Sequence, residues 1–123
     1  METPRTRRYV MFSEASDRRL FRRANVSVEL RLLAPEQHVM LLSHTIDLSL
    51  RGAFIRSNRA LPIGSLVSLA FDRGRQRDPL KLEAEVVRVG EHEGRFPGIA
   101  LQFRNLTDSD EAVIAELIRR SRP

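Results

Sequence analysis

Two short stretches of the sequence carry side chains that could hold a ligand. The first, DRRLFRR at residues 17–23, places four arginines around an apolar pair. A guanidinium group can bind phosphate oxygens through two parallel hydrogen bonds and can stack on an aromatic ring. The second, DLSLRG at residues 47–52, offers a carboxylate, a hydroxyl and a glycine close together. The first stretch suits a negatively charged group, and the second has two alternative roles.

The DLSLRG stretch fits a binding role and a structural role. Asp47 and Ser49 share a face if the segment is extended, because side chains alternate along a strand. Gly52 permits a positive φ angle, a bulge or the close approach of a ligand to the backbone. Alternatively, the side chains of Asp47 and Ser49 hydrogen-bond to the backbone of a β-turn. These residues alone leave both roles open.

The remaining residues do not indicate catalysis. His44, Asp47 and Ser49 match a catalytic triad in composition, but alternation along a strand predicts that His44 faces away from Asp47. His38 and His44 lack a third ligand at metal-binding spacing, so we expect surface histidines and no metal site. The chain has no cysteine, and its glycines are spread among turns rather than gathered in a phosphate-binding loop. We therefore expect neither an enzyme nor a cofactor.

Positive charge is concentrated at the N-terminus. Residues 1–23 contain seven arginines and three carboxylates, a balance of +4, and the rest of the chain supplies only +1 of the net charge of +5. This composition predicts a flexible arginine-rich arm over residues 1–24. All but one of the basic residues are arginine, a bias that a GC-rich genome would also produce.

The sequence also predicts where the protein resides. No apolar run approaches the ~20 residues that span a bilayer. The basic N-terminus lacks the apolar segment of a secretory signal. We expect a cytoplasmic protein that does not insert into a membrane.

From residue 26 onward, apolar and polar residues alternate in six segments, which predicts six β-strands. The segments are 26–33, 38–46, 51–57, 65–71, 80–90 and 98–103. The charged stretch 72–79 is predicted to be a hairpin loop. Val86 and Val87 interrupt the alternation, which predicts a bulge or bend. Closing six antiparallel strands into a barrel would remove their exposed edges.

The apolar period changes near the C-terminus. Thr107, followed by Asp108, Asp110 and Glu111, is typical of a helix start. Four apolar residues then form one stripe: Val113, Ile114, Leu117 and Ile118. We expect a helix over about residues 107–120 that covers an opening or a face of the barrel. The predicted fold is mainly β: a six-stranded antiparallel β-barrel with a C-terminal α-helix, over residues 25–123.

The two candidate stretches, in this order and spacing, resemble the PilZ domain family. Arg19 and Arg23 form an Arg-x-x-x-Arg motif directly before the first strand. An Asp-x-Ser-x-x-Gly motif begins at Asp47, between the second and third strands. PGIALQF at residues 97–103, followed by the capped helix, is similar to the last strand and C-terminal helix of the family. The resemblance covers about residues 18–120 and implies a PilZ-like barrel.

PilZ domains bind cyclic di-GMP, a bacterial second messenger with two guanines and two phosphates, and the resemblance implies the same ligand here. Arg19 and Arg23 suit phosphate oxygens or guanine O6 and N7. Asp47 can accept hydrogen bonds from guanine N1–H and N2–H₂. Ser49 can donate to a phosphate or brace the loop, and Gly52 leaves room.

Two further arginines extend the implied site. Arg18 is basic and precedes the motif, which in such domains favours an intercalated pair of ligands. Arg18 and Arg22 also satisfy the Arg-x-x-x-Arg spacing, so the operative pair stays open. We prefer Arg19 and Arg23 because Arg23 abuts the strand. Arg22, a possible additional contact, departs from the Pro or His that the family often has there.

The resemblance implies a bacterial cytoplasmic receptor whose ligand orders the arm over the face carrying Asp47 and Ser49. The ordered arm would change binding to a downstream effector protein, whose pathway the sequence does not indicate. Two alternatives stay open: a PilZ-type interaction module that ignores the nucleotide, and a small barrel that binds nucleic acid. A single tyrosine and no tryptophan argue against nucleic acid.

Overall fold

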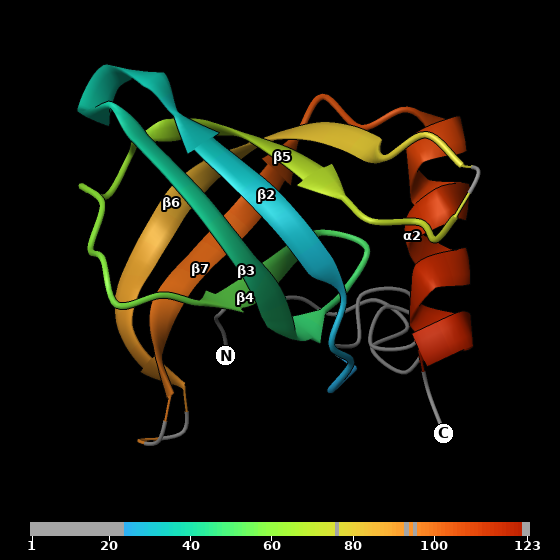
Figure 1. Ribbon diagram of the computed structural model, residues 1–123, viewed down its shortest axis with the longest axis horizontal. Coiled ribbons are helices and arrows are strands. Elements are labelled where there is room, and N and C mark those ends of the chain that lie inside the picture. Colours follow the sequence, from blue (N-terminus) through green and yellow to red (C-terminus); the bar gives the residue numbers. More distant parts are fainter. Residues whose placement is uncertain (1–23, 76, 93, 95, 122–123) are drawn as a thin grey trace, which may run out of the picture.

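Six antiparallel strands form a closed barrel in the order β2-β3-β4-β7-β6-β5 (Figure 1). The computed structural model describes residues 24–75, 77–92, 94 and 96–121. The strands are β2 (Glu29–Ala34), β3 (Val39–Leu48), β4 (Gly52–Arg56), β5 (Leu66–Phe71), β6 (Leu80–His92) and β7 (Phe96–Arg104). A 3-10 turn, η1 (Pro35–Gln37), joins β2 to β3, and helix α2 (Asp108–Ser121) follows β7. The predicted barrel with its C-terminal helix is confirmed.

Strand β2 shows how alternation fills the barrel. Leu30, Leu32 and Ala34 are buried, and the residues between them are exposed. Across the interior, the rings of Phe71 and Phe103 meet edge to face with their centroids 6.0 Å apart, a favourable aromatic arrangement. Burying a Leu or Phe side chain stabilises a fold by about 1.5–3 kcal/mol, so these alternating residues supply most of the driving force.

Helix α2 begins where its sequence predicts. The backbone N–H of Asp110 donates to Thr107 Oγ1 at 3.0 Å, and the N–H of Thr107 donates to Asp110 Oδ2 at 3.1 Å. This reciprocal pair satisfies two N–H groups that the first helical turn leaves without partners. Ile114 and Leu117 are buried in the same core cluster as the barrel residues, so α2 packs its apolar stripe against the barrel (Figure 1). In the described part of the chain, no helix is long and apolar enough to cross a membrane.

Strand β2 begins at Glu29 rather than at the predicted residue 26, because a side chain takes over the pairing. Thr45 Oγ1 donates to the Val26 carbonyl at 2.5 Å and accepts from the Val28 N–H at 2.9 Å. The backbone N–H of Thr45 donates to the Val28 carbonyl at 3.0 Å. Val26 and Val28 remain buried. Thr45 therefore fastens the residues before β2 to β3.

Thr45→Val should lower the free energy of unfolding by about 2–4 kcal/mol, because it leaves one buried N–H and one buried carbonyl without their partner. Thr45→Ser keeps the hydroxyl and loses one methyl group, at a cost of about 1 kcal/mol. Urea denaturation of the three proteins measures both differences. Equal losses for Val and Ser would show that the hydroxyl does not fasten the segment.

Candidate functional site

A bulge in β3 determines which side of the barrel Asp47, the first residue of the DLSLRG stretch, faces. Thr45 pairs with Ile55 of β4, but the next pair is Asp47 with Phe54, so Ile46 is an extra residue. Ile55 belongs to the core cluster and its neighbour Phe54 does not. Directly paired residues share a face of the sheet. Asp47 therefore lies on the outer side of the barrel with Phe54, although unbroken alternation from Thr45 would turn it inward.

The bulge corrects one expectation from the sequence. His44 pairs with the exposed Glu29 and lies on the outer side, so it does not face away from Asp47 as alternation predicts. The argument from opposite faces against a triad is therefore wrong. The hydrogen bonds identified for the Asp47 and Ser49 side chains go to backbone groups, not to His44.

Asp47 is 1% exposed, and its Oδ1 accepts a hydrogen bond from the Phe54 N–H at 3.2 Å. A buried carboxylate is costly unless hydrogen-bond donors or cations surround it. The bond to Phe54 ties Asp47 to β4 at the bulge, where an ordinary ladder contact is lost. Asp47 therefore contributes to the fold at the position where a ligand contact is predicted.

Ser49 braces the turn between β3 and β4. Its Oγ accepts from the N–H groups of Arg51 and Gly52, each at 3.2 Å, and lies 3.3 Å from the Gly52 carbonyl, to which it can donate. The Ser49 N–H donates to the same carbonyl at 2.9 Å. The structural alternative, a turn held by its own side chains, is thus observed for Ser49. Donation from Ser49 to a phosphate stays a prediction.

Gly52 is required by a close approach, and the approaching group is another strand. Its φ angle is not positive. A Cβ at this position would overlap the backbone carbonyl oxygen of Leu101 in β7, because Gly52 pairs directly with Gln102. Gly52 therefore leaves room for β7, and the expectation that it leaves room for a ligand stays a prediction.

The structure ties Ala24, the residue after the arginine stretch, to the DLSLRG stretch. Ala24 forms an isolated antiparallel bridge with Leu48. The Ala24 N–H donates to the Leu48 carbonyl at 2.9 Å, and the Leu48 N–H donates to the Ala24 carbonyl at 3.0 Å. Leu48 lies between Asp47 and Ser49, so the residue that follows Arg23 is held beside both motif side chains.

The four predicted arginines lie outside the described residues, as does the predicted arm up to residue 23. They are Arg18, Arg19, Arg22 and Arg23. Their assignment to a ligand remains a prediction. The bridge nevertheless fixes the point at which their segment meets the barrel.

Arg88 is a cation on the outer side of the barrel that the sequence did not indicate as a site residue. Arg88 in β6 lies with its guanidinium carbon 5.5 Å from the ring centre of Phe54, within the range of a cation–π contact. The predicted bulge at Val86–Val87 is confirmed by a register shift between Val86 and Arg88. This shift lets Arg88 pair with Ala100 on the outer side, where Phe54 also lies. Arg88 and Phe54 come together because β7 lies between β4 and β6, and Ala100 of β7 pairs with both residues.

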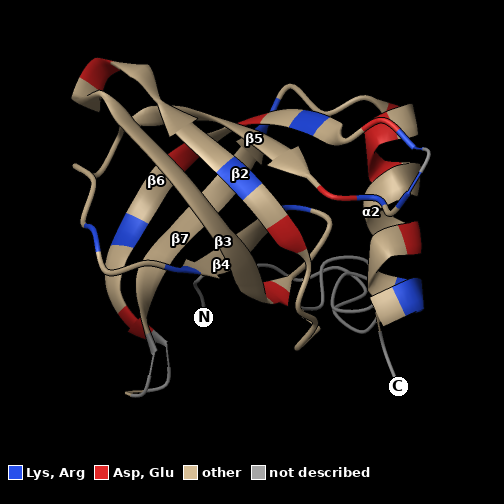
Figure 2. Cartoon of the chain, in the orientation of Figure 1, with Lys and Arg blue, Asp and Glu red and all other residues tan. Residues whose placement is uncertain are grey.

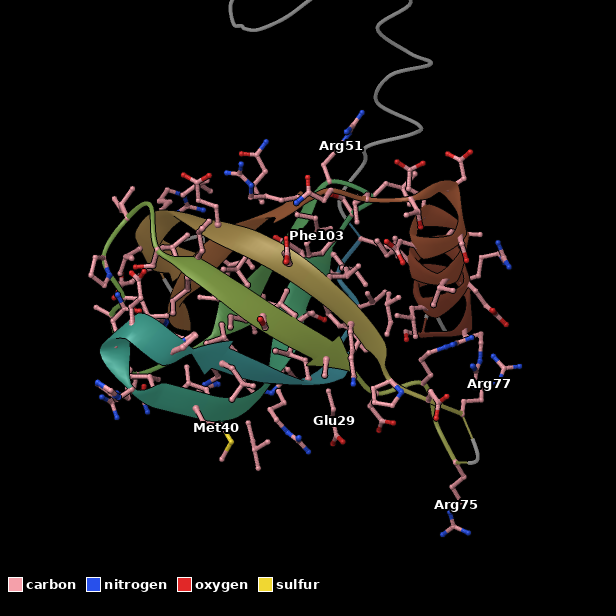
Figure 3. The ribbon with its side chains drawn as sticks, turned by 90° about the horizontal axis from the view of Figure 1, so that it is seen from above. Glu29, Met40, Arg51, Arg75, Arg77 and Phe103 are labelled. Atoms are coloured by element: carbon pink, nitrogen blue, oxygen red, sulfur yellow. The ribbon has the colours of Figure 1, made fainter. Side chains whose placement is uncertain are left out.

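The turn itself carries an exposed arginine. Arg51 within DLSLRG is exposed and projects away from the barrel (Figure 3). Among the residues that the structure describes, no three His, Cys, Asp or Glu side chains are grouped to hold a metal ion. Exposed arginine and a buried carboxylate are suited to a ligand that carries both negative charge and hydrogen-bond donors.

Comparisons with known proteins identify the family. A family model described as PilZ domain matches residues 17–120. A search of curated proteins finds no match.

Solved structures with the same fold include two PilZ domains and a motility inhibitor. The PilZ domain of CeSA from a cellulose-synthesizing bacterium has a TM-score of 0.60 and 16% identity, and the match covers 80% of this chain and 95% of that one. The PilZ domain of YcgR from Escherichia coli, solved with c-di-GMP, has a TM-score of 0.64 and 18% identity, with coverage of 81% and 89%. The Bacillus subtilis inhibitor of motility MotI/DgrA has a TM-score of 0.65 and 16% identity; the match covers 84% of this chain and half of that one. At these identities the similarity establishes the fold.

Gly52→Ala should destabilise the protein by about 3 kcal/mol or more, at the upper end of overpacking costs, because a backbone carbonyl in a paired strand cannot move aside. Gly94→Ala is a useful comparison: Gly94 has a φ of 69° with nothing near its Cβ position, so only the left-handed backbone cost of about 1–2 kcal/mol applies. Thermal or urea unfolding measures both. A smaller loss at Gly52 than at Gly94 would contradict the close-approach explanation.

Proposed function

The chain belongs to the PilZ domain family, and we propose that it is a receptor for cyclic di-GMP. The family supports this ligand, and the similar YcgR domain was solved with c-di-GMP. In our proposal the arginines of residues 17–23 hold the phosphates and guanine edges. The turn from Asp47 to Gly52 forms the opposing side of the site.

The observation that carries the proposal is the bridge between Ala24 and Leu48. Arg23 is bonded to Ala24, and consecutive Cα atoms are about 3.8 Å apart. The bridge holds Ala24 beside Asp47 and Ser49. The chain that carries the arginine motif therefore enters the described barrel at Ala24, beside the second motif, which supports a two-sided ligand site.

Binding at this site is coupled to rearrangement. Asp47 is 1% exposed, so it can accept from a guanine only if the incoming ligand moves the groups around it. A carboxylate has about four lone-pair sites, so its bond to Phe54 can persist while a guanine binds. The ligand thus selects a different arrangement of the groups that cover Asp47.

The consequence of binding is a changed surface. Residues 1–23 carry a net charge of +4, and the phosphates of the ligand offset the repulsion among these arginines. Ligand binding orders the arm over the outer side of the barrel near Asp47, and the new surface alters binding to an effector protein. With Arg18 as an additional contact, the site holds an intercalated pair of ligands. We place this receptor in the bacterial cytoplasm and assign it no catalysis.

A second candidate function is an interaction module that does not bind the nucleotide. It is favoured by the structural roles of the motif: Ser49 braces its own turn and Gly52 accommodates β7. Both residues would be needed for folding even without a ligand. A direct titration separates the two candidates.

Titration calorimetry with cyclic di-GMP should show saturable binding to the wild-type protein at micromolar ligand. Arg23→Ala should weaken binding by about 10-fold to 100-fold, the loss of one or two charge-assisted hydrogen bonds. Arg75→Ala is the matched control, because it removes the same charge from a side chain that points away from the barrel (Figure 3). No binding by the wild-type protein would reject the receptor proposal.

The same titration resolves which arginines act. If Arg19 and Arg23 are the operative pair, Arg19→Ala should weaken binding as much as Arg23→Ala. Arg18→Ala should then change chiefly the stoichiometry, from two ligands to one. A larger loss from Arg18→Ala and Arg22→Ala would assign the motif to that pair.

Asp47→Asn tests the carboxylate without removing the acceptor for the Phe54 N–H. We expect about a 10-fold or greater loss of affinity. Asparagine replaces one carboxylate oxygen, which accepts hydrogen bonds from the guanine N–H groups, with an NH2 group, which is itself a donor. Urea denaturation of the same variant separates binding from folding. An unchanged affinity would remove Asp47 from the site while leaving the receptor class intact.

A further inference from the structure

The outer side of the β2–β3 hairpin is an exposed surface with apolar and charged parts, which we term the hairpin face. Its members are the outward-pointing residues of the two strands: Glu29, Arg31, Leu33, Met40, Leu42 and His44. Leu42 is 76% exposed, Met40 62% and Leu33 42%. Three large aliphatic side chains this exposed on one side of a small domain indicate a binding surface rather than scattered surface residues.

No described element covers the hairpin face. Strands β2 and β3 form the front of the barrel in Figure 1, and α2 stands at one side. Figure 3 shows Glu29 and Met40 projecting from the same side of the barrel, away from it. The face is therefore open to a partner in the part of the chain that the structure describes.

The charges on this face form an ordered pair. Glu29 and Arg31 are two residues apart on β2, and Figure 2 shows an acidic and a basic segment on that strand with one uncharged segment between them. No ion pair joins either side chain to another described residue. Each side chain thus presents an unmatched charge beside exposed apolar surface.

We propose that the hairpin face binds the same face of a second copy of this chain. Cross-strand pairs define rows on the face: Glu29 with His44, Arg31 with Leu42, and Leu33 with Met40. Consider a two-fold axis that lies between the two copies, perpendicular to the strands and between the first and second rows. It places each strand of one copy antiparallel to the same strand of the second copy. Glu29 then faces Arg31 of the second copy, and Arg31 faces Glu29. Leu42 faces His44 of the second copy and is covered, while the third row, Leu33 and Met40, lies at the edge of the contact.

The charges select this register over its neighbours. An axis through the second row would set Arg31 against Arg31 of the second copy, two like charges in contact. An axis between the second and third rows would set Arg31 against Leu33, which removes water from a cation without offering a carboxylate. Only the first register gives two reciprocal opposite-charge contacts, and such complementarity specifies orientation in symmetric interfaces.

The size of the face sets the strength of the contact. A standard interface buries about 800 Å² per partner and uses about 20–30 residues on each side. The hairpin face has fewer outward residues than this, so the dimer is weak and forms with rising concentration. The face contains none of Asp47, Ser49 and Gly52, and the inference does not rest on the proposed function.

Charge exchange tests the dimer and its register together. Sedimentation equilibrium of the full chain, from about 10 μM to about 1 mM, should show a monomer–dimer equilibrium. Glu29→Arg and Arg31→Glu should each raise the dissociation constant by about 10-fold or more, because each replaces two attractive contacts by two repulsive ones. The double variant Glu29→Arg/Arg31→Glu should restore the wild-type constant. Glu91→Arg, which makes the same charge change at an exposed residue of β6, should leave self-association unchanged apart from net charge.

Each remaining outcome counts against the proposal. A monomer at about 1 mM, whether or not another protein binds the face, removes the second copy as its occupant. A dimer that ignores both single reversals uses a different surface, and failure of the double variant to recover rejects this register. Leu42→Gln provides a check that is independent of charge: it should also weaken the dimer, and circular dichroism should show an unchanged fold.

Discussion

The extra residue at Ile46 is the constraint on which the rest of this surface depends. Without it, Asp47 would follow Thr45 into the alternating core of β3. With it, Thr45 stays buried and fastens Val26 and Val28, while Asp47 turns to the outer side and bonds to the Phe54 N–H. One added residue thus separates a structural hydroxyl that points inward from a buried carboxylate on the outer side of the barrel, two positions apart on the same strand.

The motif residues serve the fold and the proposed site at once. Ser49 satisfies backbone donors in its own turn, and Gly52 admits the carbonyl of Leu101. A loss of binding in a variant of either residue therefore has two explanations, loss of a ligand contact or loss of the turn. The arginine stretch lies outside this turn in the sequence, so its variants test the ligand without changing the residues that brace the turn.

The sequence was sufficient for the fold and for part of the site. Alternation predicted six strands because inward residues are apolar nearly throughout, and the double valine predicted the bulge in β6 because it visibly breaks the pattern. The bulge at Ile46 leaves no such mark, since Thr45 and Asp47 are buried polar residues whose partners are set by tertiary structure. The contact between Arg88 and Phe54 depends on β7 lying between β4 and β6. Strand order of this kind is not encoded in local periodicity.

Strand β3 carries both proposed surfaces, and its bulge decides how they relate. Leu42 and Asp47 are five residues apart, about 16 Å along an extended strand. A bulge bends its strand and increases the local twist, so the outer side beyond Ile46 faces a different direction from the hairpin face. The hairpin face ends at His44, three residues before Asp47, so the two surfaces are neighbours on one strand. If ligand binding changes the bend at Ile46, the two equilibria are linked, and linkage is reciprocal. Any factor by which the nucleotide strengthens self-association is then the factor by which self-association strengthens nucleotide binding.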